Sequence, residues 1–351
     1  MQTRNNQHIL VLGAGNFGTC LGQHLACQGH RVEIWARSPE VAEGINSKHI
    51  NPKYLKEISL SPRVKAFTRL EEAPIQAYDA IVIAIPTQYV RMVVEQISDK
   101  MHIDQLLVCA AKGIEVGTEK LPSDILAEIC GTFISHHMVS LSGPSFAIEV
   151  AKKQPTGVSV ASRVTVRAEW AQDVFHSPKF RAYTSNDPIG LEVAGAMKNV
   201  IAIAAGACAG LGFQANSRAT LITRGLAEMT RVGVAVGANP LTFKGLGGVG
   251  DLFLTCSSEK SRNFSVGYIM GQGGSLDEAL GQIGSVAEGV TTTLSAQKLS
   301  KSLNVSTPIT NAVYQVIYDK KPISQVVLEL ISRDAKPEFE VELETPKKET
   351  P

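Results

Sequence analysis

The sequence has no excess of charge of either sign, because 34 Lys and Arg residues stand against 33 Asp and Glu residues and the formal net charge is +1. A chain this close to neutral produces no long-range field that gathers nucleic acid or an anionic membrane. We therefore expect neither a nucleic-acid partner nor insertion into a membrane.

Cysteine pairs and long hydrophobic runs are also missing. The six cysteines include no C-x-x-C pair, which predicts reduced thiols that pack as small core residues. The polar segment before Ile9 lacks the apolar core of a secretory signal. The longest apolar stretch, residues 200–213, is shorter than the roughly 20 residues that span a bilayer. These absences predict a cytoplasmic protein in which that stretch is a buried helix.

Patterns of metal ligands are lacking as well. Among the eight histidines, His136 and His137 are adjacent and are predicted to enter a strand, where their side chains would face opposite ways. We therefore expect no metal.

The first half of the chain alternates short β-branched runs with helical patterns. A length of 351 residues favours two domains, since one domain usually needs roughly 100 to 200. The predicted strands cover residues 8–12, 31–35, 79–85, 106–111, 138–142 and 157–161. The predicted helices between them cover residues 17–28, 88–97, 120–129 and 164–175. This alternation predicts an α/β Rossmann-type domain over residues 1–187 with a mostly parallel, doubly wound sheet.

The strand patterns stop after Asp187. Helices are predicted at residues 191–210, 215–236, 261–270, 275–282, 290–301 and 308–317, separated by Gly or Pro. We therefore expect an all-helical substrate domain over residues 188–332. Residues 333–351 contain few large apolar side chains and many charges, which predicts a disordered tail.

The strongest local motif is G-A-G-N-F-G, residues 13–18, at the point where a strand ends and a helix begins. Gly13 permits a tight turn, Gly15 lets the backbone approach a pyrophosphate, and Gly18 lets the helix pack against the strand. The N–H groups at the start of that helix are free to bind phosphate. The alternative is a glycine-rich turn without a ligand, but the strand–glycine–helix–strand context favours a dinucleotide site.

At the end of the second strand the sequence reads W-A-R, residues 35–37. A site specific for NAD usually places an acid there for the ribose hydroxyls, and this chain has Arg37 instead. A guanidinium can pair with a 2′-phosphate or stack on adenine, so the residue favours NADPH without excluding NADH. The alternative is a solvated surface arginine.

Two segments could reach from the sheet to a substrate. Lys112 follows the strand ending near Ala111, and ligands of open α/β sheets bind beyond the carboxyl ends of the strands. The segment S-G-P-S-F-A, residues 142–147, leads from a strand into a helix whose first N–H groups could hold a substrate oxygen. The alternative for Lys112 is a solvated loop lysine. The alternative for residues 142–147 is that Gly143 and Pro144 only mark the start of a helix.

Three further groups lie in the helical half. Lys198 stands in an almost wholly apolar helix, where desolvation lowers a lysine pKa toward the value that a general acid or base requires. Asp251 ends a glycine-rich loop, and S-R-N, residues 261–263, begins a helix with the donors that suit a phosphomonoester. Snorkelling of Lys198 and helix capping by Asp251 or Ser261 are the alternatives.

In these segments the chain resembles the NAD(P)-dependent glycerol-3-phosphate dehydrogenase family of the bacterial type. The ordered motifs are G-A-G-N-F-G-T, W-A-R, A-A-K-G, S-G-P-S-F-A, E-V-A-G-A-M-K-N, G-G-V-G-D-L, S-R-N and V-A-E-G-V. They cover roughly residues 9–322, and together they are far more specific than one glycine motif.

The resemblance implies that Lys198 accepts the proton in glycerol 3-phosphate oxidation and donates it in dihydroxyacetone phosphate reduction, with Lys112 and Asp251 as the other catalytic residues. It implies substrate contacts by Lys112, Gly143, Ser145, Lys198, Asp251, Ser261, Arg262 and Asn263. It implies contacts to NADP(H) or NAD(H) by Gly13, Gly15, Asn16, Phe17, Gly18, Arg37, Lys112, Ala147, Arg262, Val286 and Glu288. A homodimer and a role in glycerophospholipid synthesis are also implied.

Two other functions stay open at this point. A β-hydroxyacid dehydrogenase of the 6-phosphogluconate or 3-hydroxyisobutyrate kind also joins a dinucleotide domain to a helical domain with a catalytic lysine, although S-R-N and S-G-P-S-F-A argue against it. A non-catalytic NADPH sensor would keep the glycine motif but has no need for Lys112, Lys198 and Asp251.

Overall fold

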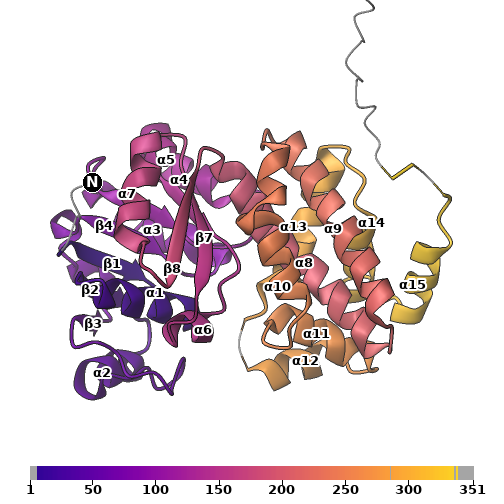
Figure 1. Cartoon of the computed structure of the whole chain (residues 1–351), viewed down its shortest axis with the longest axis horizontal. Helices are drawn as coiled ribbons and strands as arrows, with labels where there is room; N and C mark the ends of the chain where they lie inside the picture. The colour runs from indigo at the N-terminus through magenta and orange to yellow at the C-terminus, as the bar shows by residue number, and fades with distance from the viewer. Residues whose placement is uncertain (1–5, 285, 336, 339–351) are drawn as a thin grey trace, which may run out of the picture.

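The computed structural model describes residues 6–284, 286–335 and 337–338. An α/β part formed by the first half of the chain lies beside a helical part formed by the second half, along the long axis of the molecule (Figure 1). Within the described residues all strands precede residue 186, and helix α8, Pro188–Gly210, begins the helical part. The predicted fold class, a Rossmann-type domain followed by helices, is confirmed.

The sheet has eight strands in the order β3-β2-β1-β4-β5-β6-β7-β8. Neighbouring strands are parallel except for the antiparallel pair β6 and β7. The strands are β1 His8–Leu12, β2 Arg31–Trp35, β3 Val64–Phe67, β4 Ala80–Ile83, β5 Leu106–Cys109, β6 Val139–Ser142, β7 Thr156–Ala161 and β8 Phe180–Ser185. The sequence patterns missed β3 and β8. These are the two edge strands, and exposed residues alternate with buried ones in both, so neither carries a long apolar run.

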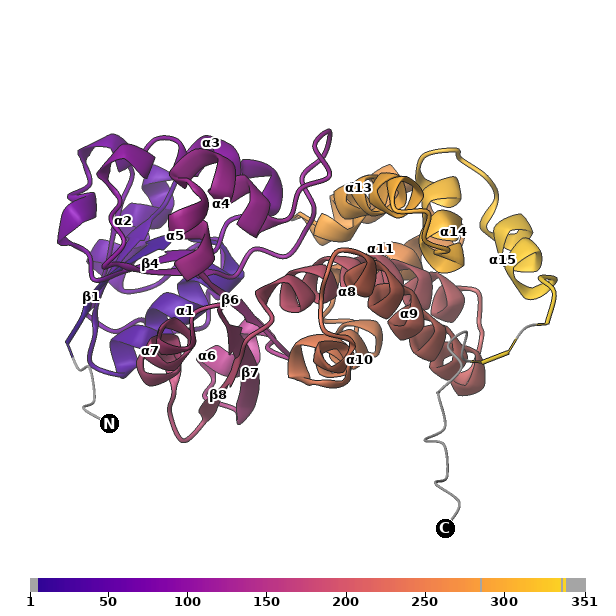
Figure 2. The same ribbon diagram turned by 90° about the horizontal axis from the view of Figure 1, so that it is seen from above.

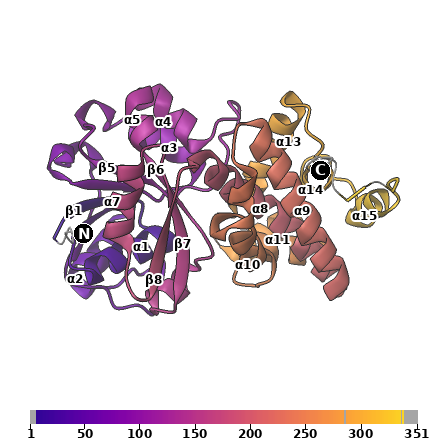
Figure 3. The same cartoon turned by 45° about the horizontal axis from the view of Figure 1, so that its top comes forward.

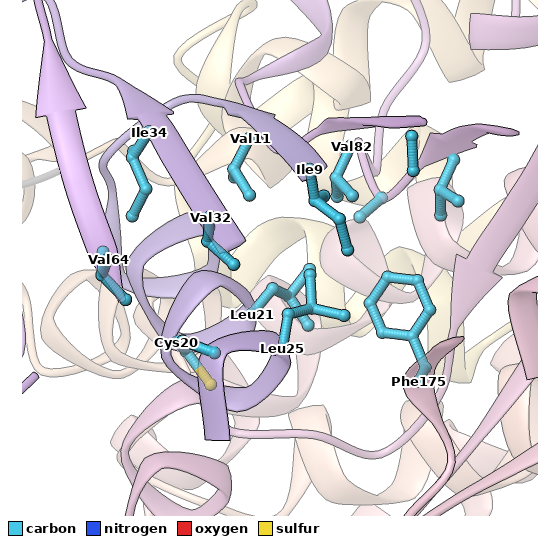
Figure 4. Close-up of a cluster of buried hydrophobic side chains, with 14 of the residues drawn as sticks. Ile9, Val11, Cys20, Leu21, Leu25, Val32, Ile34, Val64, Val82 and Phe175 are labelled. Atoms are coloured by element: carbon cyan, nitrogen blue, oxygen red, sulfur yellow. The ribbon is translucent and has the colours of Figure 1, made fainter. Parts of the chain in front are cut away.

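The sheet is covered on both faces, as the continuous apolar strands require. Alternate residues of β1 enter different cores: Ile9 and Val11 face one helix layer, and Leu10 and Leu12 face the other. The first layer contains α1 Asn16–Cys27, α2 Pro39–Lys48, α6 Ala147–Ala151 and α7 Thr165–Phe175. The second contains α3 Val90–Val94, α4 Pro122–Cys130 and α5 Thr132–His137. Figure 4 shows the first core, where Leu21 and Leu25 of α1 meet β1 and Phe175 of α7.

The helical part is built around α8, which neighbouring helices surround (Figures 2 and 3). Among the described residues α8 is the one helix long and apolar enough to cross a membrane, but most of it is buried within this fold. The predicted buried helix over residues 200–213 is therefore its second half, although Leu211 and Phe213 lie beyond it and are partly exposed. The other helices are α9 Ala215–Ala235, α10 Asp251–Cys256, α11 Arg262–Gly271, α12 Leu276–Ile283, α13 Glu288–Ser302, α14 Pro308–Ile317 and α15 Ile323–Ile331.

Several local predictions need correction. His136 and His137 end helix α5 instead of entering a strand, because the strand begins only at Val139. The predicted helix at residues 88–97 is shorter: one tight turn precedes the α-helical residues Val90–Val94. Cys27 is exposed at the end of α1, so it is not a core residue. Helices α2, α5, α10 and α15 were not predicted, whereas the helix expected after the S-G-P-S-F-A segment is present as α6. In the predicted tail, residues 336 and 339–351 lie outside the described residues.

Candidate active site

A cleft of about 550 Å³ separates the carboxyl ends of the strands from the helical part. Parallel strands place their following loops at one edge of a sheet, so segments far apart in sequence meet there. Of the predicted site residues, the cleft is lined by Gly13, Gly15, Asn16, Phe17, Arg37, Lys112, Ser145, Ala147, Lys198, Asp251, Ser261, Arg262, Asn263, Val286 and Glu288. Gly18 and Gly143 do not line it.

The glycine-rich turn has the geometry expected of a pyrophosphate cradle. Gly13 has φ +113°, and a Cβ atom there would lie 2.7 Å from the carbonyl oxygen of Ala84. A Cβ atom on Gly18 would lie 2.0 Å from the carbonyl oxygen of Gly13, so this glycine packs α1 against the turn rather than facing a ligand. Around the Cβ position of Gly15 there is open space, and no side chain caps the N-terminus of α1. The free N–H groups of this helix therefore face the cleft.

Gly143 shapes the backbone turn that follows β6. Its φ is +149°, and a Cβ atom would lie 2.8 Å from the Cα atom of Val158, so the turn after β6 passes close to β7. This turn brings Ser145 and Ala147 to the cleft. The Ser145 hydroxyl donates a 2.9 Å hydrogen bond to the carbonyl oxygen of Gly143.

Three charged side chains meet where the two parts face each other. The carboxylate of Asp251, at the start of α10, lies between two lysines: its Oδ2 is 2.7 Å from Nζ of Lys112, and its Oδ1 is 3.2 Å from Nζ of Lys198. Lys112 follows β5 and Lys198 belongs to α8, so this cluster joins both parts of the molecule. Asp251 and Lys198 are buried, and Lys112 is partly buried.

Thr255 completes this cluster, and sequence reasoning missed it. Its hydroxyl accepts a 2.8 Å hydrogen bond from Nζ of Lys198 and donates a 2.6 Å bond to the backbone carbonyl of Asp251. The signal that could have found it is its position four residues after Asp251, because residues i and i+4 share one face of a helix.

Burial and the neighbouring charges shift the pKa values of Lys198 and Asp251. Burial lowers the pKa of Lys198 below its ordinary value, although the Asp251 anion acts in the opposite direction and Lys112 adds to the decrease. Burial acts to raise the pKa of Asp251, but the two lysines outweigh it and hold that pKa below its usual range. At neutral pH the carboxylate is thus ionised, and the Lys198 ammonium loses its proton more readily than a solvated lysine.

Asn263 is held by two neighbours. Its Nδ2 donates a 2.9 Å hydrogen bond to Oδ1 of Asn199, and its Oδ1 accepts a 2.9 Å bond from the backbone N–H of Gly289. Asn199 in turn donates a 3.4 Å bond to the backbone carbonyl of Lys112. These bonds fix the start of α11 relative to α8 and to the loop after β5.

The predicted phosphate end of the cleft lies at the start of α11. Ser261 caps this helix, since its hydroxyl accepts a 3.3 Å hydrogen bond from the N–H of Phe264, and it also lines the cleft. The capping interpretation is therefore correct without excluding a ligand contact. Arg262 is exposed. The preceding Lys260 forms a 2.6 Å ion pair with Glu149 of α6, which bridges the two parts of the molecule.

Glu288 begins α13, and its Oε2 is buried without a hydrogen-bond partner among the described residues. Burial raises the pKa of this carboxyl to about 7, and the positive charge of Arg262 partly opposes that effect. A buried polar atom without a partner is costly unless a ligand or water satisfies it. Val286 is half exposed at the same wall of the cleft.

A Rossmann-type cradle next to a buried lysine–carboxylate cluster defines the class of nicotinamide-dependent oxidoreductases. Two family models cover the chain: the N-terminus of NAD-dependent glycerol-3-phosphate dehydrogenase matches residues 8–168, and its C-terminus matches residues 187–328. The chain belongs to this family. It is an oxidoreductase that uses a nicotinamide cofactor.

Individual relatives agree with the family models. Glycerol-3-phosphate dehydrogenase (NAD(P)+) from Enterococcus faecalis is 43% identical over 338 residues, which are 96% of this chain and 99% of that protein. The protein of the same name from Latilactobacillus sakei is 44% identical over 336 residues, or 95% and 98% of the two chains. The crystal structure of glycerol-3-phosphate dehydrogenase from Coxiella burnetii matches with a TM-score of 0.88 and 32% identity, covering 93% of this chain and 99% of that one. The family resemblance stated from the sequence is confirmed.

Proposed function

We propose that this chain interconverts dihydroxyacetone phosphate and sn-glycerol 3-phosphate with NADP(H) or NAD(H). The observation that carries the proposal is the cluster of buried Lys198 and Asp251 with partly buried Lys112, which lies where a dinucleotide cradle and a helical wall share one cleft. Carbonyl reduction needs a proton donor held beside the reacting oxygen, and this cluster is suited to that task.

In this proposal Lys198 is the general acid and base. Its ammonium protonates the C2 oxygen of dihydroxyacetone phosphate in reduction, and its neutral amine accepts the hydroxyl proton of glycerol 3-phosphate in oxidation. Thr255 and Asp251 hold Nζ in place through the 2.8 Å hydrogen bond and the 3.2 Å ion pair. Lys112 keeps Asp251 ionised and contacts both substrate and cofactor.

The substrate phosphate is assigned to the start of α11. Ser261, Arg262 and Asn263 offer a hydroxyl, a guanidinium and an amide beside a helix N-terminus, which together suit a phosphomonoester dianion. Ser145 faces the substrate from the sheet side, with Gly143 shaping its turn.

The residues of the cradle fit a nicotinamide dinucleotide. The open space at Gly15 and the uncapped start of α1 suit a pyrophosphate, with Asn16, Phe17 and Ala147 beside it. When bound in its reduced form, the nicotinamide supplies the hydride for the C2 carbonyl. Glu288 would give its unpartnered oxygen to the cofactor amide or ribose, and Val286 would cover the same region.

Two further parts of the proposal, a homodimer and a supply of glycerol 3-phosphate for glycerophospholipid synthesis, rest on the family resemblance. The proposed cytoplasmic location rests on cysteines that form no C-x-x-C pair, and catalysis without a metal is proposed from the lack of metal-ligand spacing among the histidines. We also propose that residues 1–187 and 188–332 act as the cofactor and substrate domains. The described residues contain no group of three or more His, Cys, Asp or Glu side chains that could hold a metal ion.

The test is the loss of NADPH or NADH absorbance with purified protein and dihydroxyacetone phosphate. Unphosphorylated dihydroxyacetone, 6-phosphogluconate with NADP+ and 3-hydroxyisobutyrate with NAD+ are assayed in parallel. Turnover of the phosphorylated ketone alone supports the proposed reaction and the phosphate site. Turnover of one of the hydroxyacids, or tight NADPH binding without any turnover, contradicts the proposal.

A further inference from the structure

The loop between α2 and β3 forms part of the wall of the same cleft that Arg37 lines, and neither the sequence motifs nor the proposed mechanism uses it. Asn51 anchors this loop. Its side chain is fully buried and donates hydrogen bonds of 2.9 Å to the carbonyl oxygen of Ala14 and 2.8 Å to the hydroxyl of Thr19. The loop is therefore fastened directly to the glycine-rich turn and to α1.

The same asparagine shapes the residues that follow it. Its Oδ1 accepts hydrogen bonds from the backbone N–H groups of Lys53, at 3.1 Å, and Tyr54, at 3.0 Å. Both residues line the cleft. The side-chain amide of Asn51 thus binds the glycine-rich turn through its N–H groups and the backbone of residues 53 and 54 through its oxygen, which holds that backbone in one conformation. The position of Lys53 therefore depends on the position of the glycine-rich turn.

Further contacts hold the rest of the loop. A Cβ atom on Gly44 of α2 would lie 2.7 Å from Cδ of Pro52, so the loop and this helix are in close contact. Glu57 forms a 2.7 Å ion pair with Lys152, which follows α6. Leu55 packs against the first hydrophobic core. The loop is thus part of the folded domain and presents Lys53 from a fixed backbone.

The charged side chains that the α/β part contributes to the cleft lining are all positive. Arg37 and Lys53 both line it and both are exposed. Ser38 lies between Arg37 and α2 and lines the cleft too, and its hydroxyl makes no capping hydrogen bond to the helix that it precedes. Among the described residues that line the cleft, the carboxylates are Asp251 and Glu288, which belong to the helical part.

We propose that Lys53 is a second cation, beside Arg37 and the Ser38 hydroxyl, for the 2′-phosphate of NADPH, and that it makes the cleft selective for NADPH over NADH. The ribose of a Rossmann-bound dinucleotide lies at the end of the second strand, which here is the position of Arg37. A lysine binds phosphate as a point charge, and an arginine binds it through a planar fork, so the two act together on one dianion. This inference rests on the proposed function only in placing a dinucleotide in this cleft.

The test measures binding of adenosine fragments by isothermal titration calorimetry, without any catalytic turnover. Adenosine 2′,5′-bisphosphate carries the 2′-phosphate, and adenosine 5′-monophosphate lacks it. We expect K53A to weaken binding of the bisphosphate by about tenfold, as for the loss of one charged hydrogen bond, and to leave binding of the monophosphate unchanged. K53R should restore most of the bisphosphate affinity. K56A is the matched control, because Lys56 is exposed on the same loop and does not line the cleft.

Two results overturn the inference: K53A binds both fragments like the wild type, or it weakens both fragments equally. The latter would mean that Lys53 only supports the loop. Failure of the proposed function has a different signature. A wild-type protein that prefers the bisphosphate through Lys53, yet does not reduce dihydroxyacetone phosphate, contradicts the reaction and supports the 2′-phosphate site. Turnover of dihydroxyacetone phosphate, without a preference for the bisphosphate that depends on Lys53, supports the reaction and contradicts the 2′-phosphate site.

Discussion

The protonation state of Lys198 depends on burial and on two charged neighbours. Burial and Lys112 favour the neutral amine, and Asp251 favours the ammonium. A general acid–base works best when both of its forms are accessible near the working pH. Burial, and to a smaller extent Lys112, thus lower the pKa of Lys198 from its ordinary value, which is far above neutrality, and Asp251 limits this decrease.

Replacing Lys198 with alanine should lower turnover in both directions by roughly 10²-fold or more, because a positioned acid–base group is lost. NADPH affinity should stay close to that of the wild type. Steady-state rates and fluorescence titration measure the two quantities. K301A is the control, since Lys301 is exposed on α13. Near-normal turnover of K198A would refute the assigned role.

Replacing Asp251 with asparagine should lower the pKa of Lys198 further, because the anion that favours its ammonium is removed. Oxidation of glycerol 3-phosphate needs the neutral amine, so its rate rises with pH through this pKa. Reduction needs the ammonium, so its rate falls as pH increases through the same value. In D251N both limbs should move to lower pH by about one unit or more. Profiles of kcat/KM against pH that keep the wild-type midpoint would contradict this account.

Replacing Arg262 with alanine should raise KM for dihydroxyacetone phosphate roughly tenfold to a hundredfold, which corresponds to about 1.5 to 3 kcal/mol for a charged hydrogen bond to phosphate. Because Arg262 is exposed, we expect a smaller loss of binding free energy than for a fully buried ion pair with phosphate. R262K should recover only part of the loss, because lysine lacks the planar fork. An unchanged KM in R262A would move the phosphate site elsewhere.

At the scale of elements, glycines bring α8 and α11 into backbone contact. A Cβ atom on Gly206 would lie 1.9 Å from the carbonyl oxygen of Phe264, and one on Gly267 would lie 1.9 Å from that of Ile203. Small residues permit such close approach, and any larger side chain must separate the helices. The position of the S-R-N segment at the start of α11 therefore depends on glycines one turn and more away from it.

Replacing Gly206 with alanine should lower the free energy of unfolding by about 1 to 3 kcal/mol through overpacking. It should also raise KM for the phosphorylated substrate more than KM for the cofactor, because α11 moves relative to α8. Chemical denaturation and steady-state kinetics measure these effects. G281A is the control: a Cβ atom on Gly281 meets no atom within 4 Å, so helix propensity should stabilise it by about 0.5 to 1 kcal/mol. Equal stabilities of G206A and the wild type would exclude the close contact.

At the scale of the whole molecule, the buried carboxyl of Glu192 joins the helical part to the α/β part. Glu192 of α8 accepts a 2.6 Å hydrogen bond from the Ser123 hydroxyl, a 3.2 Å bond from the Ser123 N–H and a 3.2 Å bond from the Ser140 hydroxyl. Burial raises its pKa from 4.5 to about 7, although these donors act in the opposite direction. The orientation of α8, and with it Lys198, depends partly on this contact.

Replacing Glu192 with glutamine should change how stability varies with pH. A carboxyl whose folded-state pKa is raised contributes stability below its unfolded pKa, and this contribution is lost as pH rises through about 7. Glutamine stays neutral, so E192Q should gain on the order of 2 kcal/mol relative to the wild type between about pH 5 and about pH 8. Urea denaturation across this range measures the difference. Parallel pH profiles would refute it, and E95Q, at an exposed position of the surface, serves as the control.

Much of the fold could be predicted from local patterns. The central strands β1, β4 and β5 are continuous apolar runs because helices cover both faces, so their signal survives without any tertiary information. The edge strands β3 and β8 lack such runs, because each edge is partly open to solvent. Short helices such as α6 and α10 carry too few turns to show a period, and neighbouring elements hold them in place.

The order of motifs along the chain is enough to identify the family and the cofactor cradle, and to single out Lys198 as the residue on which the proposed chemistry depends. Glycines, a charged residue in an apolar helix and ordered local motifs are readable because each is a property of neighbouring positions. The folded chain was needed to see that Lys112, Lys198 and Asp251 form one cluster and that Thr255 completes it. It also showed that Asn51 fastens the loop of Lys53 to the glycine-rich turn. The physical reason is that these contacts join segments far apart in the chain. The spacing of neighbouring residues in the sequence does not show which distant segments come together when the chain folds.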